Sequence, residues 1–210
     1  MTIRVIPTID PYLLPKVLPK VRKQYLNFKL KIIEEQSYIL VEKVRTGEID
    51  AAILVLPYVM EGLMNFDFWQ KNFYWICHKD ECLQKAHEIS SEELEIDKLM
   101  LPKEGHCLKE HALAACSLQN RKQDADFDSA SLHTLVQMVA GKFGITIVRH
   151  MALDQLTYSE SELKAIHLNE PAPHSTIALI IRPNYVRSKA LSILQNIFTQ
   201  QLTHKCSLAW

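Results

Sequence analysis

Two cysteines with very different neighbours lie nine residues apart in the segment 101–116. Cys107 is closely followed by the charged residues Lys109 and Glu110, whereas Cys116 ends an apolar, alanine-rich run. The reactive form of a cysteine is the thiolate, which is favoured by nearby positive charge and by the N-terminus of a helix. These surroundings favour different roles for the two thiols, with the more reactive one at Cys107.

The local sequence predicts that Cys107 lies at or next to the start of a helix. Residues 104–106 are typical of a loop, and residues 108–116 contain strong helix formers. The free N–H groups and the dipole at a helix start favour an anion, and Lys109 adds positive charge. The apolar side chains fall along one stripe of this helix: Leu108, Ala112, Ala115 and Cys116. We therefore expect Cys116 to be buried and unreactive.

A helix that runs through both cysteines keeps their sulfur atoms apart. With a rise of about 1.5 Å per residue, the Cα atoms of Cys107 and Cys116 lie roughly 13 Å apart, whereas a disulfide needs a Cα separation of about 4.4–6.8 Å. A bond between them requires the segment to unwind, so oxidation would become a conformational signal. Spacing alone also allows two unrelated cysteines, one exposed and one in the core.

The first half of the chain alternates strand-like and helix-like segments. The elements are expected in this order: strand 3–6, a helix from Asp10 to Val21, strand 28–32, helix 36–45 and strand 51–56. Asp10-Pro11 provides an N-cap and a first-turn proline, and Gly47 ends the second helix. Such repetition favours a parallel sheet covered by helices.

The second half indicates another α/β lobe. Aromatic, strand-like pieces between 66 and 77 mark the first crossing between lobes, and Pro171 and Pro173 suit the return crossing. The remaining elements are expected in this order: strand 98–101, helix 132–140, strands 145–148, 163–168 and 176–181, and a last helix 186–202 that packs on the first lobe. The expected fold is α/β with two Rossmann-like subdomains, residues 1–70 with 176–210 and residues 71–175, of which the second carries the cysteine segment.

Composition limits the classes of function. The 210 residues are 48% hydrophobic, which is enough for a substantial core. Lys plus Arg and Asp plus Glu number 24 each, so no basic surplus indicates nucleic acid. No run of about 18 apolar residues and no signal-like leader occur, and the five cysteines form no tight framework. We therefore expect a cytoplasmic chain without membrane association.

The other cysteines and their neighbouring histidines carry weaker signals. His78, Cys82 and His87 could be metal ligands, but a metal site usually needs four suitable groups, and this spacing matches no zinc signature. We therefore expect no metal and no cofactor. Cys77 and Cys206 lie in apolar surroundings, where a free cysteine packs as a small hydrophobic residue.

The cysteine segment resembles a known redox loop. In the OxyR family of LysR-type transcription regulators the peroxide-sensing loop runs Gly-His-Cys-Leu-Arg-Asp, and residues 105–110 of this chain are Gly-His-Cys-Leu-Lys-Glu, followed by Cys116. Three further stretches agree in the same order, at 6–15, 131–140 and 144–146. LysR-type regulators share these stretches more widely, so the His-Cys loop is the specific part of a resemblance that covers nearly the whole chain.

This resemblance implies the regulatory domain of a hydrogen-peroxide-sensing transcription activator, with a periplasmic-binding-protein-like fold. Peroxide would oxidise Cys107 to sulfenic acid, and Cys116 would resolve it to a disulfide. The new bond would remodel residues 104–130 and the dimer, and so switch the transcription of oxidative-stress genes. The resemblance implies a regulator and not an enzyme.

The resemblance also implies which residues bind peroxide, namely Thr8, Ser37 and His106. Thr8 and Ser37 lie near expected strand ends, where the loops of open α/β sheets line a crevice. Ser37 replaces a threonine of the family and keeps the hydroxyl, while a simple helix cap is the alternative role for Thr8. Lys109 and Glu110 would support the site, keeping the charges of the family's Arg and Asp but losing the bidentate fork of arginine.

The implied partners are hydrogen peroxide, a second copy of the chain in a homodimer (a tetramer in the full-length protein), and a thiol reductant such as glutaredoxin or thioredoxin. LysR-type regulators carry an N-terminal winged helix-turn-helix, and nothing ahead of Ile3 supplies one. We therefore expect DNA binding only through a domain that is absent from this chain. Two alternatives stay open: a LysR-type domain that binds a small organic effector in the cleft between subdomains, its cysteines incidental, and a peroxide-destroying enzyme with repeated turnover.

Overall fold

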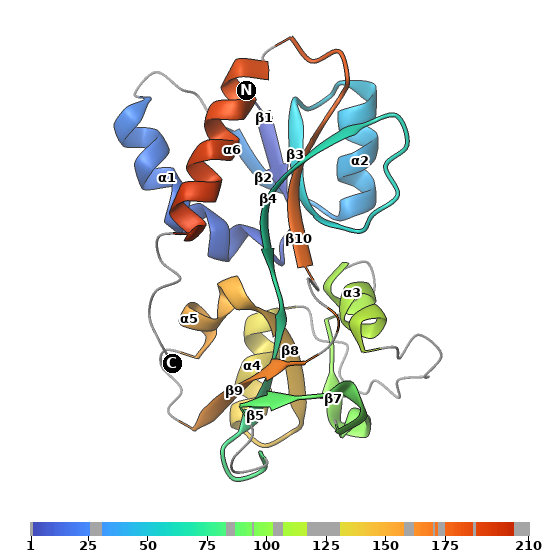
Figure 1. Ribbon diagram of the computed structural model, residues 1–210, viewed down its shortest axis with the longest axis vertical. Helices are drawn as coiled ribbons and strands as arrows, with labels where there is room; N and C mark the ends of the chain where they lie inside the picture. Colours follow the sequence, from blue (N-terminus) through green and yellow to red (C-terminus); the bar gives the residue numbers. More distant parts are fainter. Residues whose placement is uncertain are drawn as a thin grey trace. The chain divides into compact units, whose positions relative to one another are not determined.

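The chain divides into two units that each contain a β-sheet. In the computed structural model (Figure 1), the first unit comprises residues 1–70 and 176–210, and the second comprises residues 71–175. The structure describes residues 2–25, 31–82, 87–93, 95–102, 107–116, 131–157, 162–169, 171, 175–186 and 188–203.

The first unit contains a five-stranded sheet in the order β2-β1-β3-β10-β4. Its strands are β1 (Thr2–Val5), β2 (Lys31–Glu34), β3 (Ala51–Leu56), β4 (Met64–Lys71) and β10 (Ser175–Ile181). β1 runs parallel to β2 and β3, as the sequence pattern predicts, whereas β10 runs antiparallel to β3. Because β10 enters this sheet after the second unit, no crossover helix constrains it to be parallel.

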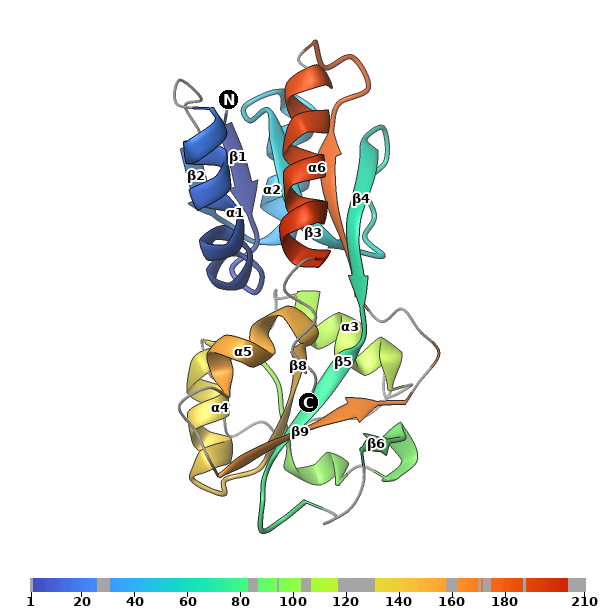
Figure 2. The same ribbon diagram turned by 60° about the vertical axis from the view of Figure 1, so that its left-hand side comes forward.

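Three helices cover this sheet: α1 (Asp10–Gln24), α2 (Ser37–Thr46) and α6 (Ser188–Thr203). Figures 1 and 2 show α1 and α6 side by side, with α2 on the other side of the sheet. The rings of Phe68 on β4 and Phe198 on α6 lie 5.1 Å apart. The last helix therefore packs on the first unit, as predicted.

The start of α1 differs from the prediction by one residue. Ile9 is the N-cap and Asp10 is the first helical residue. Asp10 is only 9% exposed. Burial, followed by the hydrogen bond and the charge of the Glu34 carboxyl, raises the pKa of Asp10 from 3.8 to about 7. The folded chain therefore holds this proton more tightly than the unfolded chain does.

This raised pKa predicts a pH-dependent stability. Folding takes up a proton at Asp10 between about pH 4 and about pH 7, so the free energy of unfolding should fall as the pH rises through that range. Each pKa unit corresponds to about 1.4 kcal/mol, which limits the effect to about 4 kcal/mol. Urea unfolding measures it, and Asp10→Asn should flatten the pH dependence and stabilise the chain above neutral pH. Equal pH dependence in the wild-type chain and the variant would contradict the assignment to Asp10.

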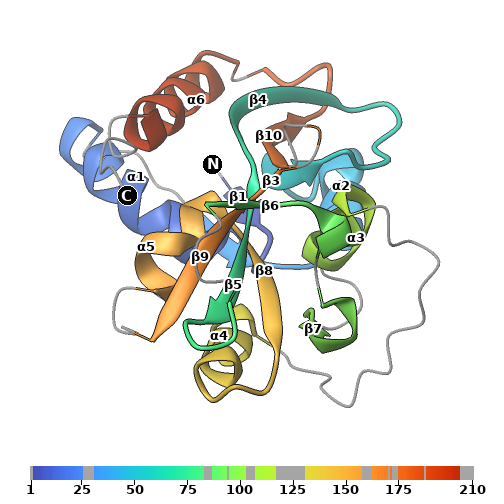
Figure 3. The same ribbon diagram turned by 60° about the horizontal axis from the view of Figure 1, so that its bottom comes forward.

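The second unit contains a mixed five-stranded sheet in the order β6-β9-β5-β8-β7. Its strands are β5 (Phe73–His78), β6 (Glu88–Ile89), β7 (Leu99–Met100), β8 (Ile145–Arg149) and β9 (Leu163–Leu168). β5 is central and antiparallel to both β8 and β9, as Figure 3 shows, while β6 and β7 add short parallel edges.

The second unit also contains the helix that begins at Cys107. Its helical segments are α3 (Cys107–Ala115), α4 (Leu132–Ala140), α5 (Leu153–Leu156), and the 3-10 turns η1 (Ser91–Glu93), η2 (Ile96–Lys98) and η3 (His150–Ala152). The Ser131 hydroxyl caps α4 by accepting the N–H of Thr134 at 3.1 Å, and α4 packs on β5 and β8. Within the described part of the chain, no helix is long and apolar enough to cross a membrane.

The predicted α/β class is confirmed, and several elements match closely. The strand predicted at 51–56 is β3, and the helix predicted at 132–140 is α4. The strand expected at 28–32 falls partly outside the described residues, and the described part of it, β2, starts at Lys31. The structure thus provides two separate α/β scaffolds, of which the second carries α3.

Candidate functional site

Cys107 is the first residue of α3, as the sequence predicts. Cys107 is only 3% exposed, so the alternative in which it is the exposed member of two unrelated cysteines is wrong. The buried residues of this segment are Cys107, Leu108, His111, Ala112 and Cys116. The helix thus buries its first thiol together with its apolar stripe, while placing it where free N–H groups favour an anion.

Arg149, the last residue of β8, lies against this thiol. Its Nη2 donates to the Sγ of Cys107 at 3.7 Å, and its Nε donates to the Oγ of Ser175 at 3.1 Å. Its guanidinium carbon lies 5.7 Å from the centre of the Phe73 ring. Arg149 is 1% exposed, and an arginine stays charged in a protein. A buried guanidinium therefore lies in direct contact with the Cys107 sulfur.

Sequence reasoning missed Arg149. The only signal was an arginine directly after the strand predicted at 145–148, which is apolar except for Thr146. A charged residue buried to this degree needs a partner of opposite charge or several acceptors. That requirement would have pointed to a nearby anionic or polarisable group, but not to Cys107 itself.

Cys116 directly follows α3, forms no disulfide and is buried, as predicted, with an exposure of 3%. Its N–H donates to the carbonyl of Ala112 at 3.0 Å, so helical hydrogen bonding continues to Cys116. A helical rise of about 1.5 Å per residue keeps the two Cα atoms too far apart for a disulfide. The conformation is therefore one in which both thiols stay free.

The three residues predicted to bind peroxide are His106, Thr8 and Ser37, and the structure describes only the last two. His106 lies outside the described residues. Thr8 follows β1 and is 7% exposed, and its hydroxyl has no hydrogen-bond partner among the described residues. Ser37 is the first residue of α2 and is 4% exposed. Both belong to the first unit, whereas Cys107 belongs to the second. Their role in binding peroxide stays a prediction.

Lys109 and Glu110 lie on α3 as expected, with Lys109 half-buried and Glu110 exposed. Residues two apart on a helix do not face each other, so Lys109 points away from the side of α3 that carries Cys107. The cation in contact with the sulfur is Arg149. The supporting roles of Lys109 and Glu110 also stay predictions.

Cys77 and Cys82 form a disulfide, with their Cα atoms 5.9 Å apart. The prediction that Cys77 packs as a free small hydrophobic residue is therefore wrong. The physical reason is the turn after β5, in which the N–H of Cys82 donates to the carbonyl of His78 at 3.0 Å. This turn brings both cysteines within bonding distance. Cys82 is consequently a disulfide partner rather than a candidate metal ligand.

Residues 1–203 match the family described as the LysR substrate binding domain. The chain belongs to this LysR family. Among curated relatives, the transcriptional regulator EstR of Acinetobacter baylyi is 34% identical over 92% of this chain and 64% of its own length. A probable hydrogen peroxide-inducible genes activator of Streptomyces viridosporus is 32% identical over 88% of this chain and 59% of its own length. The chain thus spans about three fifths of the length of these two relatives.

A solved structure supports the same assignment. The reduced form of the regulatory domain of OxyR2 from Vibrio vulnificus matches with a TM-score of 0.85 and 29% identity, over 96% of this chain and 94% of that one. The predicted periplasmic-binding-protein-like fold and the resemblance to OxyR regulatory domains are confirmed. The LysR family is one of transcription regulators.

Proposed function

We propose that this chain is the regulatory domain of a transcription activator that senses hydrogen peroxide through Cys107. The observation that carries the proposal is the contact between the Cys107 sulfur and the buried guanidinium of Arg149, at the first residue of a helix. Relatives named hydrogen peroxide-inducible genes activators and solved OxyR regulatory domains support it.

The chemistry consumes one peroxide and two thiols. The Cys107 thiolate attacks one peroxide oxygen, the O–O bond breaks, and the hydroxide that leaves takes up a proton to become water. The product is a sulfenic acid on Cys107. The Cys116 sulfur then attacks the sulfenic sulfur, a second water leaves, and a disulfide forms. Two electrons pass from the thiol pair to peroxide. A thiol reductant such as glutaredoxin or thioredoxin later returns two electrons to the disulfide.

The second step requires α3 to unwind, because its helical form holds the two Cα atoms beyond disulfide range. Leu108 and Ala112 are almost completely buried in the helical form, so unwinding must expose or repack them. We expect this rearrangement to extend over residues 104–130 and to reach the homodimer surface. Oxidation would in this way alter how a dimer, or a tetramer of the full-length protein, binds DNA through its N-terminal domain in the cytoplasm.

Peroxide itself would be bound by the hydroxyls of Thr8 and Ser37 and by the imidazole of His106, with Lys109 and Glu110 in support. The buried hydroxyl of Thr8, which has no partner among the described residues, is available for such a ligand. A slower second-order oxidation of Cys107 in Thr8→Val than in the wild-type chain tests this role, and an unchanged rate would remove Thr8 from the site.

The decisive experiment treats the reduced chain with one equivalent of hydrogen peroxide, alkylates the remaining thiols and digests with trypsin. Cleavage after Lys103, Lys109 and Arg121 places Cys107 and Cys116 on separate peptides. We expect these two peptides to become linked, with a loss of two hydrogens. Cys116→Ser should instead stop at sulfenic acid on Cys107.

A competing function is the binding of a small organic effector, since the EstR relative carries no reference to peroxide in its name. If one equivalent of peroxide leaves both thiols free for alkylation, the peroxide proposal fails and the effector function gains support. Repeated peroxide consumption in the presence of a thiol reductant would instead indicate an enzyme.

A further inference from the structure

The Cys77–Cys82 pair lies on a turn that does not depend on the disulfide. The N–H groups of Glu81 and Cys82 both donate to the carbonyl of His78 at 3.0 Å, and the N–H of Lys79 donates to the carbonyl of Glu162 at 2.8 Å. These bonds hold the turn when the sulfur atoms are separate, so the two thiols stay within reach of each other. This is the opposite of the pair on α3, which must unfold its helix before it can join.

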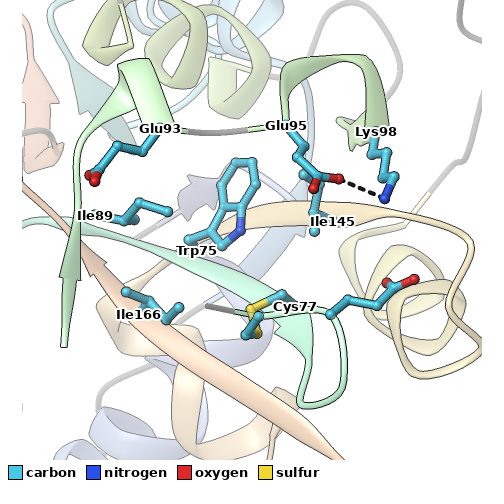
Figure 4. Close-up of a pocket in the computed structure, with 10 residues that line it drawn as sticks. Trp75, Cys77, Ile89, Glu93, Glu95, Lys98, Ile145 and Ile166 are labelled. Carbon is cyan, nitrogen blue, oxygen red and sulfur yellow. Dashed lines mark ion pairs between the residues drawn. A yellow bond between two sulfur atoms is a disulfide. The ribbon is translucent and has the colours of Figure 1, made fainter. Parts of the chain in front are cut away.

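Both cysteines line a pocket of about 130 Å³ to which β5, β6, β8 and β9 of the second sheet contribute side chains (Figure 4). Cys77 and Cys82 are 3% and 6% exposed, so a bulky protein surface cannot reach their sulfur atoms easily. A small molecule can approach through the pocket. Since a water molecule takes up about 30 Å³, the pocket has room for roughly four non-hydrogen atoms.

The pocket walls select for charge as well as size. Trp75 and Ile166 give it an apolar floor, and its rim carries Glu81, Glu93, Glu95 and Lys98. Lys98 forms an ion pair with Glu95 at 2.6 Å, which leaves a net negative rim. Such a rim repels anions and attracts cations.

We propose that Cys77 and Cys82 are a second, reversible redox couple that exchanges with small uncharged or cationic thiols and is re-formed by hydrogen peroxide. In reduction, a small thiolate attacks one sulfur, the Cys77–Cys82 bond breaks, and a mixed disulfide forms. A second thiol releases the small molecule as its own disulfide, leaving two protein thiols. In re-oxidation, one thiolate attacks peroxide with loss of hydroxide, and the other thiol displaces water from the sulfenic acid. Each direction moves two electrons.

The short span of the bond argues for this reversibility. A disulfide stabilises a fold mainly by constraining the unfolded chain, and the effect grows with the length of the loop that it closes. Cys77 and Cys82 lie five positions apart in the chain, so the bond closes a short loop and stabilises the fold less than a disulfide between distant residues would. We therefore expect β5 to stay in place when the bond opens.

The test uses the Cys107→Ser/Cys116→Ser double variant, so that failure of the peroxide proposal for Cys107 does not affect the result. Trypsin cleaves after Lys71, Lys79 and Lys85, which puts Cys77 and Cys82 on separate peptides. Linked peptides 72–79 and 80–85 should appear before treatment, disappear with cysteamine, a four-atom cationic thiol, and return with peroxide. The wild-type chain gives the same readout, because each of its five cysteines lies on its own tryptic peptide.

The charge selectivity is measured by comparing cysteamine with the slightly larger anionic thiol mercaptoacetate, and Glu81→Gln separates the effect of charge from that of size. The rate at which each small thiol reduces the disulfide in the folded chain is divided by its rate with the same chain unfolded in urea. This division cancels the intrinsic reactivity of the small thiol. We expect a ratio of at least about three in favour of cysteamine, reduced towards one in Glu81→Gln. The redox couple would be overturned if Cys77 and Cys82, once reduced, could still be alkylated after peroxide treatment. It would also be overturned if neither thiol reduced the disulfide until the chain was unfolded. Equal corrected rates would overturn the selective pocket.

Discussion

A chain that carries Cys107→Ser, with its Cys77–Cys82 disulfide intact, is expected to show no measurable oxidation at position 107 or at Cys116 after one equivalent of hydrogen peroxide. The serine hydroxyl stays un-ionised near neutral pH, so the guanidinium of Arg149, 3.7 Å from the sulfur in the wild-type chain, has no anion to stabilise. We expect oxidation at this site to slow by more than about a hundred-fold, because an unactivated hydroxyl is a poor nucleophile. Mass spectrometry should find neither sulfenic acid nor a linked peptide at Cys116.

The matched control for this prediction is Cys116→Ser, which should react once and stop. Both residues are 3% exposed, and they lie at the first position of α3 and directly after its last, so the two variants differ mainly in which sulfur is lost. If Cys116→Ser were inert and Cys107→Ser reacted normally, the attacking and resolving roles would be reversed.

Replacing Arg149 with methionine should have the second largest effect, slowing the oxidation of Cys107 roughly ten- to hundred-fold. A unit charge about 4 Å from a thiolate is worth about 1 to 4 kcal/mol, depending on how far solvent screens it. Methionine fills a similar space without charge, and the Ser175 hydroxyl loses its donor, at a cost of about 1–3 kcal/mol in stability. Stopped-flow oxidation and urea unfolding measure the two effects separately.

Two further variants make the Arg149 prediction specific. Arg149→Lys keeps the charge but not the fork that contacts both Cys107 and Ser175, so it should recover part of the rate. Arg182→Met removes an arginine that instead donates to the carbonyls of Val44 and Ile49 in the first unit. It should lower stability without slowing the reaction. A normal oxidation rate in Arg149→Met would show that the guanidinium does not assist the thiol.

Local sequence signals predict a helix or strand well where its apolar pattern or its cap is clear. The strand at 51–56 is a continuous apolar run, and it forms β3 over those same residues. The helix at 132–140 has an apolar stripe and a serine cap, and it forms α4. The position of Cys107 at a helix start follows from helix formers that begin directly after it. These features depend on neighbours within one or two turns.

The features that sequence reasoning missed depend on contacts between distant segments or on turn geometry. Arg149 and Cys107 are 42 residues apart in the chain and meet only because β8 and α3 pack together. The Cys77–Cys82 bond depends on two hydrogen bonds to the carbonyl of His78, and the five-residue separation matches no common redox motif. Helical periodicity carries no information about either arrangement, and residue type gives only the weak signal of an arginine directly after a largely apolar strand.

The order of strands in the first sheet decides which unit can fold first while the chain is being synthesised. β10 lies between β3 and β4, yet it is translated only after residues 71–175. A nascent chain therefore holds a first sheet with an inner strand missing until the whole second unit has been made. Domains generally fold in order from the N-terminus on the ribosome, but here the unit that carries Cys107 is the first that can complete its core. Chaperones that protect unpaired strand edges would be needed longest at β3 and β4.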